Sequence, residues 1–245
     1  MDPAGALTMR RRLMISALVL GCLFAGAWGT WRLSKSRTHQ LAGQLVRRVE
    51  TSDSVIALTF DDGPTAVHTD SVLAILAEFD VPATFFMVGS AMERNAEVVG
   101  RVRAQGHELG NHSYSHRQML LMRPGTIATE IETTDSLIRA TGQTGEIFMR
   151  PPYGKRLLGL PLYLSRRDRP VVLWDLEPDT YFSRAEGMTE YVLEHVQPGS
   201  IILLHVDIPA RREGRAALQA IIPALQARGF RFVTLSELMS HSPDL

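Results

Sequence analysis

The chain has 245 residues, of which 45% are apolar, and this is enough for one sizeable globular domain with a short appendage. The net charge is zero, but residues 1–50 hold eight basic and two acidic side chains (+6) and residues 51–245 hold 18 and 24 (−6). The basic part contains no run of interleaved basic and aromatic side chains, so nucleic acid is not an expected partner.

The chain begins with a basic leader, residues 1–12, followed by an uncharged span, residues 13–31. Such a span is long enough to cross a bilayer, and arginines before it favour a cytoplasmic N-terminus. We interpret it as a signal anchor of a single-pass membrane protein, with the following domain outside the cytoplasm. Cleavage as a signal peptide near Ala25-Gly26-Ala27, which would give a secreted protein, is the alternative. Lipidation of Cys22, the only cysteine, is disfavoured by the bulky Leu20.

Residues 32–53 are predicted to be a polar, basic tether, and residues 54–245 one domain in which short apolar runs alternate with helical patterns. The predicted strands are residues 56–60, 83–88, 107–109, 147–149, 171–174, 200–204 and 230–233. The predicted helices are residues 69–78, 93–103, 126–141, 185–196, 216–227 and 235–239. About seven β/α units favour a parallel α/β barrel, with a doubly wound sheet as the alternative.

Two adjacent carboxylates, Asp61 and Asp62, end the first predicted strand of the domain. In α/β folds the carboxyl ends of parallel strands collect ligands and catalytic groups. Neighbouring carboxylates disfavour each other's ionisation unless a cation lies beside them. The alternative is plain turn chemistry, since Asp, Gly and Pro all favour turns.

Two histidines, His112 and His116, follow the third predicted strand four residues apart. In a helix or tight turn this spacing presents both rings on one face. Two histidines and one carboxylate form a common open metal site, with Asp62 as the third ligand, whereas a polar loop with exposed histidines is the alternative. The His107-Glu108 pair lacks a histidine at position 111, so it is not a zincin motif, and His107 is expected to be structural.

With Asp62 on a cation, Asp61 is free to act as a base toward a water of lowered pKa. Arg150 could hold Asp61 ionised, and a rigid backbone N–H near Tyr153 could stabilise an oxyanion. His205 ends an apolar strand, where a lone histidine is usually structural, but opposite a metal site it would suit a general acid.

The motifs TFDDGP, HSYSH, RPPYG, a strand end with Trp174-Asp175, and LLH occur in this order. Over about residues 54–240 the sequence resembles the polysaccharide deacetylase family, also called carbohydrate esterase family 4 or the NodB-homology domain. The resemblance implies a distorted (β/α)7 barrel and a divalent metal, commonly zinc. It also implies hydrolysis of N-acetyl groups from an amino-sugar polysaccharide such as peptidoglycan, a chitin-like oligomer or an exported glycan.

The resemblance also implies a role for each residue of the motifs. Asp61 would be the base, His205 the acid and Arg150 the residue that orients Asp61. The metal ligands would be Asp62, His112 and His116. The substrate would contact the Tyr153 backbone, Leu203 at the acetyl methyl, Trp174 and Tyr181.

The fourth motif departs from the family pattern, which ends in Asp-Trp where this chain has Thr180 and Tyr181. Thr180 cannot supply the charge that tunes His205, so either Asp179 or Glu177 replaces it, or the pKa of His205 is lower than is usual in the family. A carbohydrate O-acetyl esterase and a non-catalytic glycan-binding domain are the alternative functions. A two-carboxylate glycosidase is disfavoured, because adjacent aspartates cannot flank a glycosidic bond.

Overall fold

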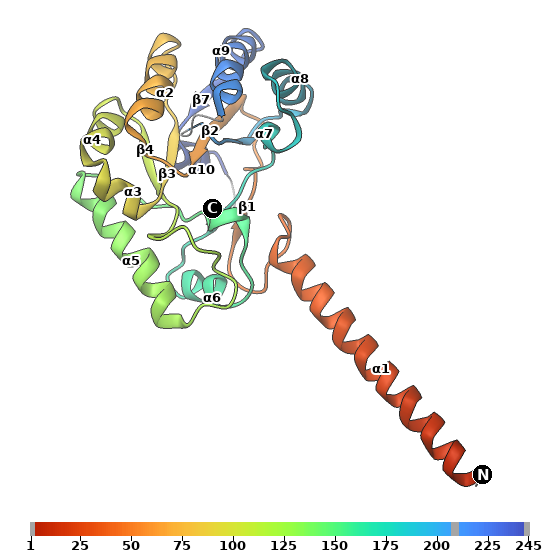
Figure 1. The fold of residues 1–245 in the computed structure, drawn as a ribbon. Coiled ribbons are helices and arrows are strands. Elements are labelled where there is room, and N and C mark those ends of the chain that lie inside the picture. Colours follow the sequence, from red (N-terminus) through yellow and green to blue (C-terminus); the bar gives the residue numbers. More distant parts are fainter. Residues whose placement is uncertain (1–2, 207–210, 243–245) are drawn as a thin grey trace.

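The computed structural model describes residues 3–206 and 211–242, with side chains from residue 12 onward. The first element is α1 (Pro3–Ser34), which extends away from the other elements and carries the N-terminus at its far end (Figure 1). Its part Arg12–Ser34 is long and apolar enough to cross a membrane, and its most apolar window has no buried residue. A helix that is apolar all round and uncovered by protein fits an apolar environment.

The strands are all parallel to the strands with which they pair. They are β1 (Leu45–Val46), β2 (Val55–Asp61), β3 (Thr84–Met87), β4 (Glu108–Asn111), β5 (Val171–Val172), β6 (Ile201–Leu204) and β7 (Arg231–Val233). The order β4-β3-β2-β6 forms the main sheet, β7 pairs with the start of β2, and β1 pairs with β5. Single bridges join Met149 to both β4 and β5, and Leu176 to β6. These parallel pairings place the carboxyl ends of the strands at one edge.

Most of the helices after α1 lie around the outside of the strands, whereas α10 (Leu235–Ser240) is seen among the strands in this view (Figure 1). The helices after α1 are α2 (Ala66–Glu78), α3 (Gly89–Arg94), α4 (Ala96–Ala104), α5 (Pro124–Ala140), α6 (Gly159–Ser165), α7 (Pro178–Tyr181), α8 (Ala185–His195), α9 (Arg212–Ala227) and α10, with a 3-10 turn at Pro152–Gly154. The predicted α/β class is confirmed by this arrangement.

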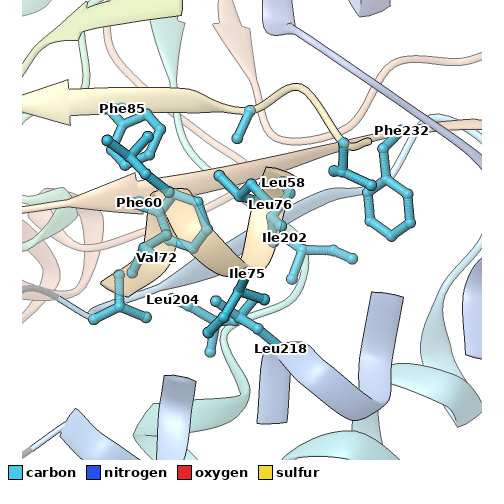
Figure 2. Packing of buried hydrophobic residues seen from close by; sticks show 14 of the residues in the cluster. Leu58, Phe60, Val72, Ile75, Leu76, Phe85, Ile202, Leu204, Leu218 and Phe232 are labelled. Carbon is cyan, nitrogen blue, oxygen red and sulfur yellow. The ribbon is translucent and has the colours of Figure 1, made fainter. Parts of the chain in front are cut away.

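The central strand β2 is buried along its whole length, and its two faces have different neighbours. Leu58 and Phe60 lie in an apolar cluster with side chains of α2 such as Leu76 (Figure 2). Because side chains alternate along a strand, Thr59 and Asp61 point the other way, toward the site. The apolar face therefore anchors the strand that ends at Asp61.

Three predicted segments differ from the structure. The helix predicted at 93–103 is two helices, α3 and α4, broken at Asn95, whose side-chain amide donates to the carbonyl of Pro64. The predicted strand 147–149 is reduced to the bridges of Met149. The segment predicted to be a tether contributes β1 and buries Val46 and Val49, so part of it packs as core.

Candidate active site

The polar residues singled out at the strand ends come together around one cleft of about 480 Å³. Asp61 and Asp62 come from the end of β2, and His112 follows β4 directly. His205 follows β6, and Tyr153 lies in the 3-10 turn. The cleft therefore lies where the parallel topology predicts a site.

Asp62, His112 and His116 could hold a cation, because one ligand atom from each lies within 4.8 Å of the others. Asp62 Oδ1 is 2.9 Å from His116 Nε2 and 3.5 Å from His112 Nε2. His112 Nδ1 lies 2.8 Å from the carbonyl oxygen of Arg150, which can only accept, so in the neutral ring Nδ1 carries the proton and Nε2 a lone pair. The Nε2 lone pair of His112 and the Oδ1 of Asp62 face each other, so a cation that lies between these two atoms would be bound by both.

Burial opposes the ionisation of Asp62, but in the absence of a cation the protonated forms of His112 and His116, which can donate to the carboxylate, and the charge of His205 outweigh it. They hold the pKa of Asp62 well below its ordinary value. The carboxylate is therefore ionised at neutral pH, which is the form that binds a metal.

Left-handed backbone conformations occur at three non-glycine residues that line the cleft. The φ angles are 80° at Asp62, 58° at His116 and 61° at Tyr153. Each such residue costs on the order of 1–2 kcal/mol, so neighbouring interactions must enforce the conformation. Such strain is concentrated at functional sites.

The loop between His112 and His116 is fixed by a buried carboxylate below it. Glu130 accepts hydrogen bonds from the backbone N–H groups of Tyr114 and Ser115, at 3.0 and 2.8 Å, and from the Ser115 hydroxyl at 2.6 Å. Because α5 carries Glu130, that helix helps to fix the positions of the two imidazoles relative to Asp62.

Asp61 is bound from below by Arg150, which is fully buried. Arg150 Nη1 lies 2.7 Å from Asp61 Oδ1 and 2.9 Å from the Thr59 hydroxyl, and Nη2 lies 2.8 Å from the Leu173 carbonyl. The guanidinium also lies 4.0 Å from the ring centroid of Phe86. Burial lowers the pKa of Arg150, and the charge of Asp61 opposes this. Asp61 Oδ2 is left facing the histidines, 3.7 Å from His112 Nε2.

His205 lies against Asp179, which supplies the charge that Thr180 lacks. Asp179 Oδ2 accepts from both the backbone N–H and the Nδ1 of His205, at 2.9 and 3.0 Å. Burial lowers the pKa of His205, but the hydrogen bond to Asp179 and the charges of Asp61, Asp179 and Asp62 outweigh it and raise the pKa to about 9. Of the two substitutes that the sequence left open, the geometry therefore selects Asp179.

Glu177 has a different task in the same cleft. Its Oε2 accepts from Arg37 Nη2 at 2.8 Å and from the indole N–H of Trp174 at 3.0 Å. Glu177, Asp179 and His205 also lie close enough to hold a cation, but hydrogen bonds within the protein already engage them. Glu177 thus joins the segment after α1 to the wall of the cleft.

Only some of the residues that were expected to contact the substrate line the cleft. Tyr153 and Trp174 line it, and Tyr153 lies against His116 with 4.9 Å between ring centroids. Leu203 is fully buried, and Leu173 lines the cleft instead. Tyr181 is 57% exposed and is not among the lining residues, although its hydroxyl lies 3.5 Å from Arg37 Nη2.

The sequence did not predict that Arg156 and the segment that it binds contribute to the site. Arg156 is 1% exposed, and burial lowers its pKa to about 10. Its side chain donates to the carbonyls of Gly154, Ser36 and His39, at 3.0, 2.8 and 3.3 Å, and to the Gln40 amide oxygen at 3.1 Å. The start of the predicted tether is therefore attached to the turn that carries Tyr153.

Comparison with known proteins points to the family that the sequence motifs predict. The family model for polysaccharide deacetylase matches residues 48–161. A peptidoglycan-N-acetylglucosamine deacetylase of Bacillus cereus is 34% identical over 191 residues, which cover 77% of this chain and 70% of that protein. The chain belongs to the polysaccharide deacetylase family, as its motifs predict.

Two solved structures show the same fold. The Bc1960 peptidoglycan N-acetylglucosamine deacetylase, in complex with an N-oxidanyl-benzamide, has a TM-score of 0.76 and 30% identity, covering 80% of this chain and 92% of that chain. A family 4 acetyl xylan esterase from Clostridium thermocellum, in complex with a cobalt ion, has a TM-score of 0.68 and 35% identity, covering 78% and 95%.

Proposed function

We propose that this chain is a metal-dependent hydrolase that removes N-acetyl groups from an amino-sugar glycan. The observation that carries the proposal is the separation of two adjacent carboxylates into different environments. Asp62 faces two imidazoles, whereas Asp61 is held by a buried arginine. In this arrangement one carboxylate can bind a metal while the other remains available as a base.

Asp62, His112 and His116 would hold the cation, and zinc suits a donor set of two nitrogens and one oxygen. One related structure was solved with a cobalt ion, which supports a metal at this site. When bound, the ion would polarise the acetyl carbonyl and lower the pKa of a water molecule.

The reaction is then completed by residues of the chain. Asp61 accepts a proton from the attacking water, and Arg150 keeps the carboxylate ionised and oriented. The backbone N–H of Tyr153 donates to the developing oxyanion. His205 donates its proton to the leaving nitrogen as the C–N bond breaks, which leaves acetate and a free amine.

A carbohydrate O-acetyl esterase is the second candidate, because the acetyl xylan esterase shares the fold. The two reactions differ in how strongly the leaving group needs a proton. An amine leaves only when it is protonated, and the Asp179 carboxylate, 3.0 Å from His205 Nδ1, favours the protonated imidazole that can supply this proton. This property favours the amide as substrate.

We extend the proposal to the fold and its location. The parallel strands, with the bridges at Met149 and Leu176, support a distorted (β/α)7 barrel. The apolar helix α1 supports a signal anchor in the cell membrane, with the catalytic domain in the periplasm or outside the cell. The substrate in this location would be peptidoglycan or a chitin-like oligomer, as the names of relatives suggest, or an exported glycan.

The test is acetate release by the purified full chain in a neutral detergent. We expect release from N-acetylchitotetraose that exceeds release from acetylated xylan, is lost with a chelator and is restored by zinc. Asp61→Asn should bind one zinc ion per chain and lose activity. Zinc-independent release, or full activity of Asp61→Asn, would refute the proposal, and faster release from the xylan ester would favour the esterase.

A further inference from the structure

Lysine is rare in this chain, and the two lysines lie together. Of 26 basic residues, 24 are arginine and only Lys35 and Lys155 are lysine. Although they are far apart in the sequence, each Nζ lies 4.9 Å from the centroid of the same ring, that of Trp31. Both lysines also line the cleft that contains Asp62 and His116. The two ammonium groups therefore lie beside one ring at the edge of the proposed active site.

The backbone positions of both lysines are fixed by one buried side chain. Lys35 directly follows α1, and Lys155 directly follows the turn Pro152–Gly154. Arg156 donates to the carbonyl of Ser36 beside the first lysine and to the carbonyl of Gly154 beside the second. The pair is therefore built by the fold and does not depend on a flexible tether.

The two ammonium groups also lack acidic partners, in contrast to other cations of the cleft. Arg37 pairs with Glu177 at 2.8 Å, and Arg211 lies 3.5 Å from Asp179. Among the side chains that the structure describes, no carboxylate lies within 4.0 Å of either lysine Nζ. Like charges held near one ring without a counter-ion repel each other, and an anion that contacts both ammonium groups removes this cost.

We propose that Lys35 and Lys155 form an anion subsite that binds a phosphate or carboxylate group carried by the glycan substrate. The inference rests on the proposed function, because it names the class of glycan that the deacetylase takes. An ammonium is a compact charge with three donors and binds phosphate well, and the Trp31 ring stabilises both ammonium groups. The subsite would bind the anion while the acetamido group lies at Asp62.

A phospholipid headgroup is another source of the same anion, because Trp31 and Lys35 lie at the end of a candidate membrane span. The position of Lys155 favours the glycan substrate as the source of the anion. This residue does not belong to the helix, and it follows the turn whose Tyr153 lies against His116. A group that binds Lys155 is therefore beside the reacting centre.

The test compares the binding of two probes, N-acetylchitotetraose and the same tetramer carrying a 1-phosphate, by calorimetry on the full chain in neutral detergent. We expect the phosphorylated tetramer to bind at least about tenfold more tightly to the wild type. The double variant Lys35→Gln, Lys155→Gln should lose this preference and keep its affinity for the neutral tetramer. The double variant Lys35→Arg, Lys155→Arg should retain most of the preference for the phosphorylated tetramer. Arg47→Gln, which removes an exposed charge away from the cleft, is the matched control.

Equal affinity of the wild type for the two tetramers would overturn the inference, as would a preference that survives in the double glutamine variant. Vesicles of phosphatidylcholine with and without phosphatidylglycerol test the other source. If the double glutamine variant loses only its binding to the anionic vesicles, the lysines bind headgroups and the inference is wrong. Acetate release from the neutral tetramer is read separately, so failure of the deacetylase proposal is distinguishable from failure of the subsite.

Discussion

Asp179→Asn tests whether Asp179 tunes the acid of the reaction. The substitution preserves the shape of the side chain, and the asparagine oxygen can still accept from the backbone N–H of His205, where Asp179 Oδ2 lies at 2.9 Å. The negative charge beside Nδ1 is lost. The structure therefore offers a way to change the pKa of His205 without removing the hydrogen bonds that place it.

The magnitude follows from the charges around the imidazole. The pKa of His205 is raised from 6.5 to about 9, against burial, by Asp179 together with the more distant charges of Asp61 and Asp62. Loss of the nearest charge should lower the pKa by about one to two units, or ~1.4–2.7 kcal/mol. Because the acid must be protonated, the fall of kcat/KM on the basic side should move to lower pH by the same amount.

The assay is the pH dependence of kcat/KM for acetate release from N-acetylchitotetraose, measured at equal zinc content. A bound cation lowers the pKa of His205 in both proteins, so the difference between them is the quantity to compare. Glu177→Gln is the matched control, because Glu177 is not among the groups that raise the pKa of His205. An unchanged basic limb in Asp179→Asn, or an equal shift in Glu177→Gln, would refute the role of Asp179.

The same raised pKa predicts how stability depends on pH. A group whose pKa is higher in the folded state stabilises the fold below its unfolded pKa, here 6.5, and this contribution is lost as the pH rises toward 9. The metal-free wild type should lose up to about 3 kcal/mol of unfolding free energy from this group across that window. Urea denaturation should show a smaller loss in Asp179→Asn, and equal losses in both proteins would contradict the linkage.

Three further substitutions test the site and its support. Asp62→Asn should abolish stoichiometric zinc binding, as measured by elemental analysis, and one tightly bound ion in this variant would exclude Asp62 as a ligand. Gly110→Ala would place a Cβ 2.5 Å from Phe86 Cδ1 and should destabilise the fold by about 1–3 kcal/mol in denaturant titrations, whereas an unchanged midpoint would show that Phe86 can move away. Arg156→Met leaves the buried carbonyl of Gly154 and the half-buried carbonyl of Ser36 without this donor and should cost about 3 kcal/mol or more. A thermal unfolding midpoint equal to that of the wild type would mean that this contact contributes nothing to stability.

The residues at the strand ends were predictable from the sequence because their positions follow from local patterns. Buried apolar runs fix strands such as β2, and parallel pairing brings the ends of β2, β4 and β6 to one edge. The order of the motifs then predicts the family, which the comparison confirms. Asp61 and His205 lie at this edge because strand direction alone places them there.

The replacement for the family's fourth-motif aspartate could not be decided from the sequence. Asp179 and Glu177 are two residues apart, and the short helix α7 between Pro178 and Tyr181 determines which carboxylate faces His205. The backbone at Glu177, with φ of −142° and ψ of 74°, turns the chain just before that helix. A turn of this kind depends on tertiary contacts and has no periodic signal in the sequence.

The role of the segment after α1 was missed for a related reason. Its basic residues are typical of a membrane-proximal tether, and nothing local distinguishes Arg37 from an exposed charge. Its partners, Trp174 and Glu177, come much later in the sequence, and Glu177 is 140 residues away from Arg37. Contacts between such distant segments are set by the folded topology. The scarcity of lysine was visible in the sequence and could have drawn attention to Lys35 and Lys155.

The contacts of Arg156 have a consequence for where the enzyme can work. Since this one side chain binds Ser36, two residues after α1 ends, the catalytic cleft has little freedom to swing on its anchor. In the membrane arrangement that we propose, the cleft stays at a nearly constant height above the lipid. Its reach is then confined to a thin layer of glycan next to the membrane, and polymer further out must come to it.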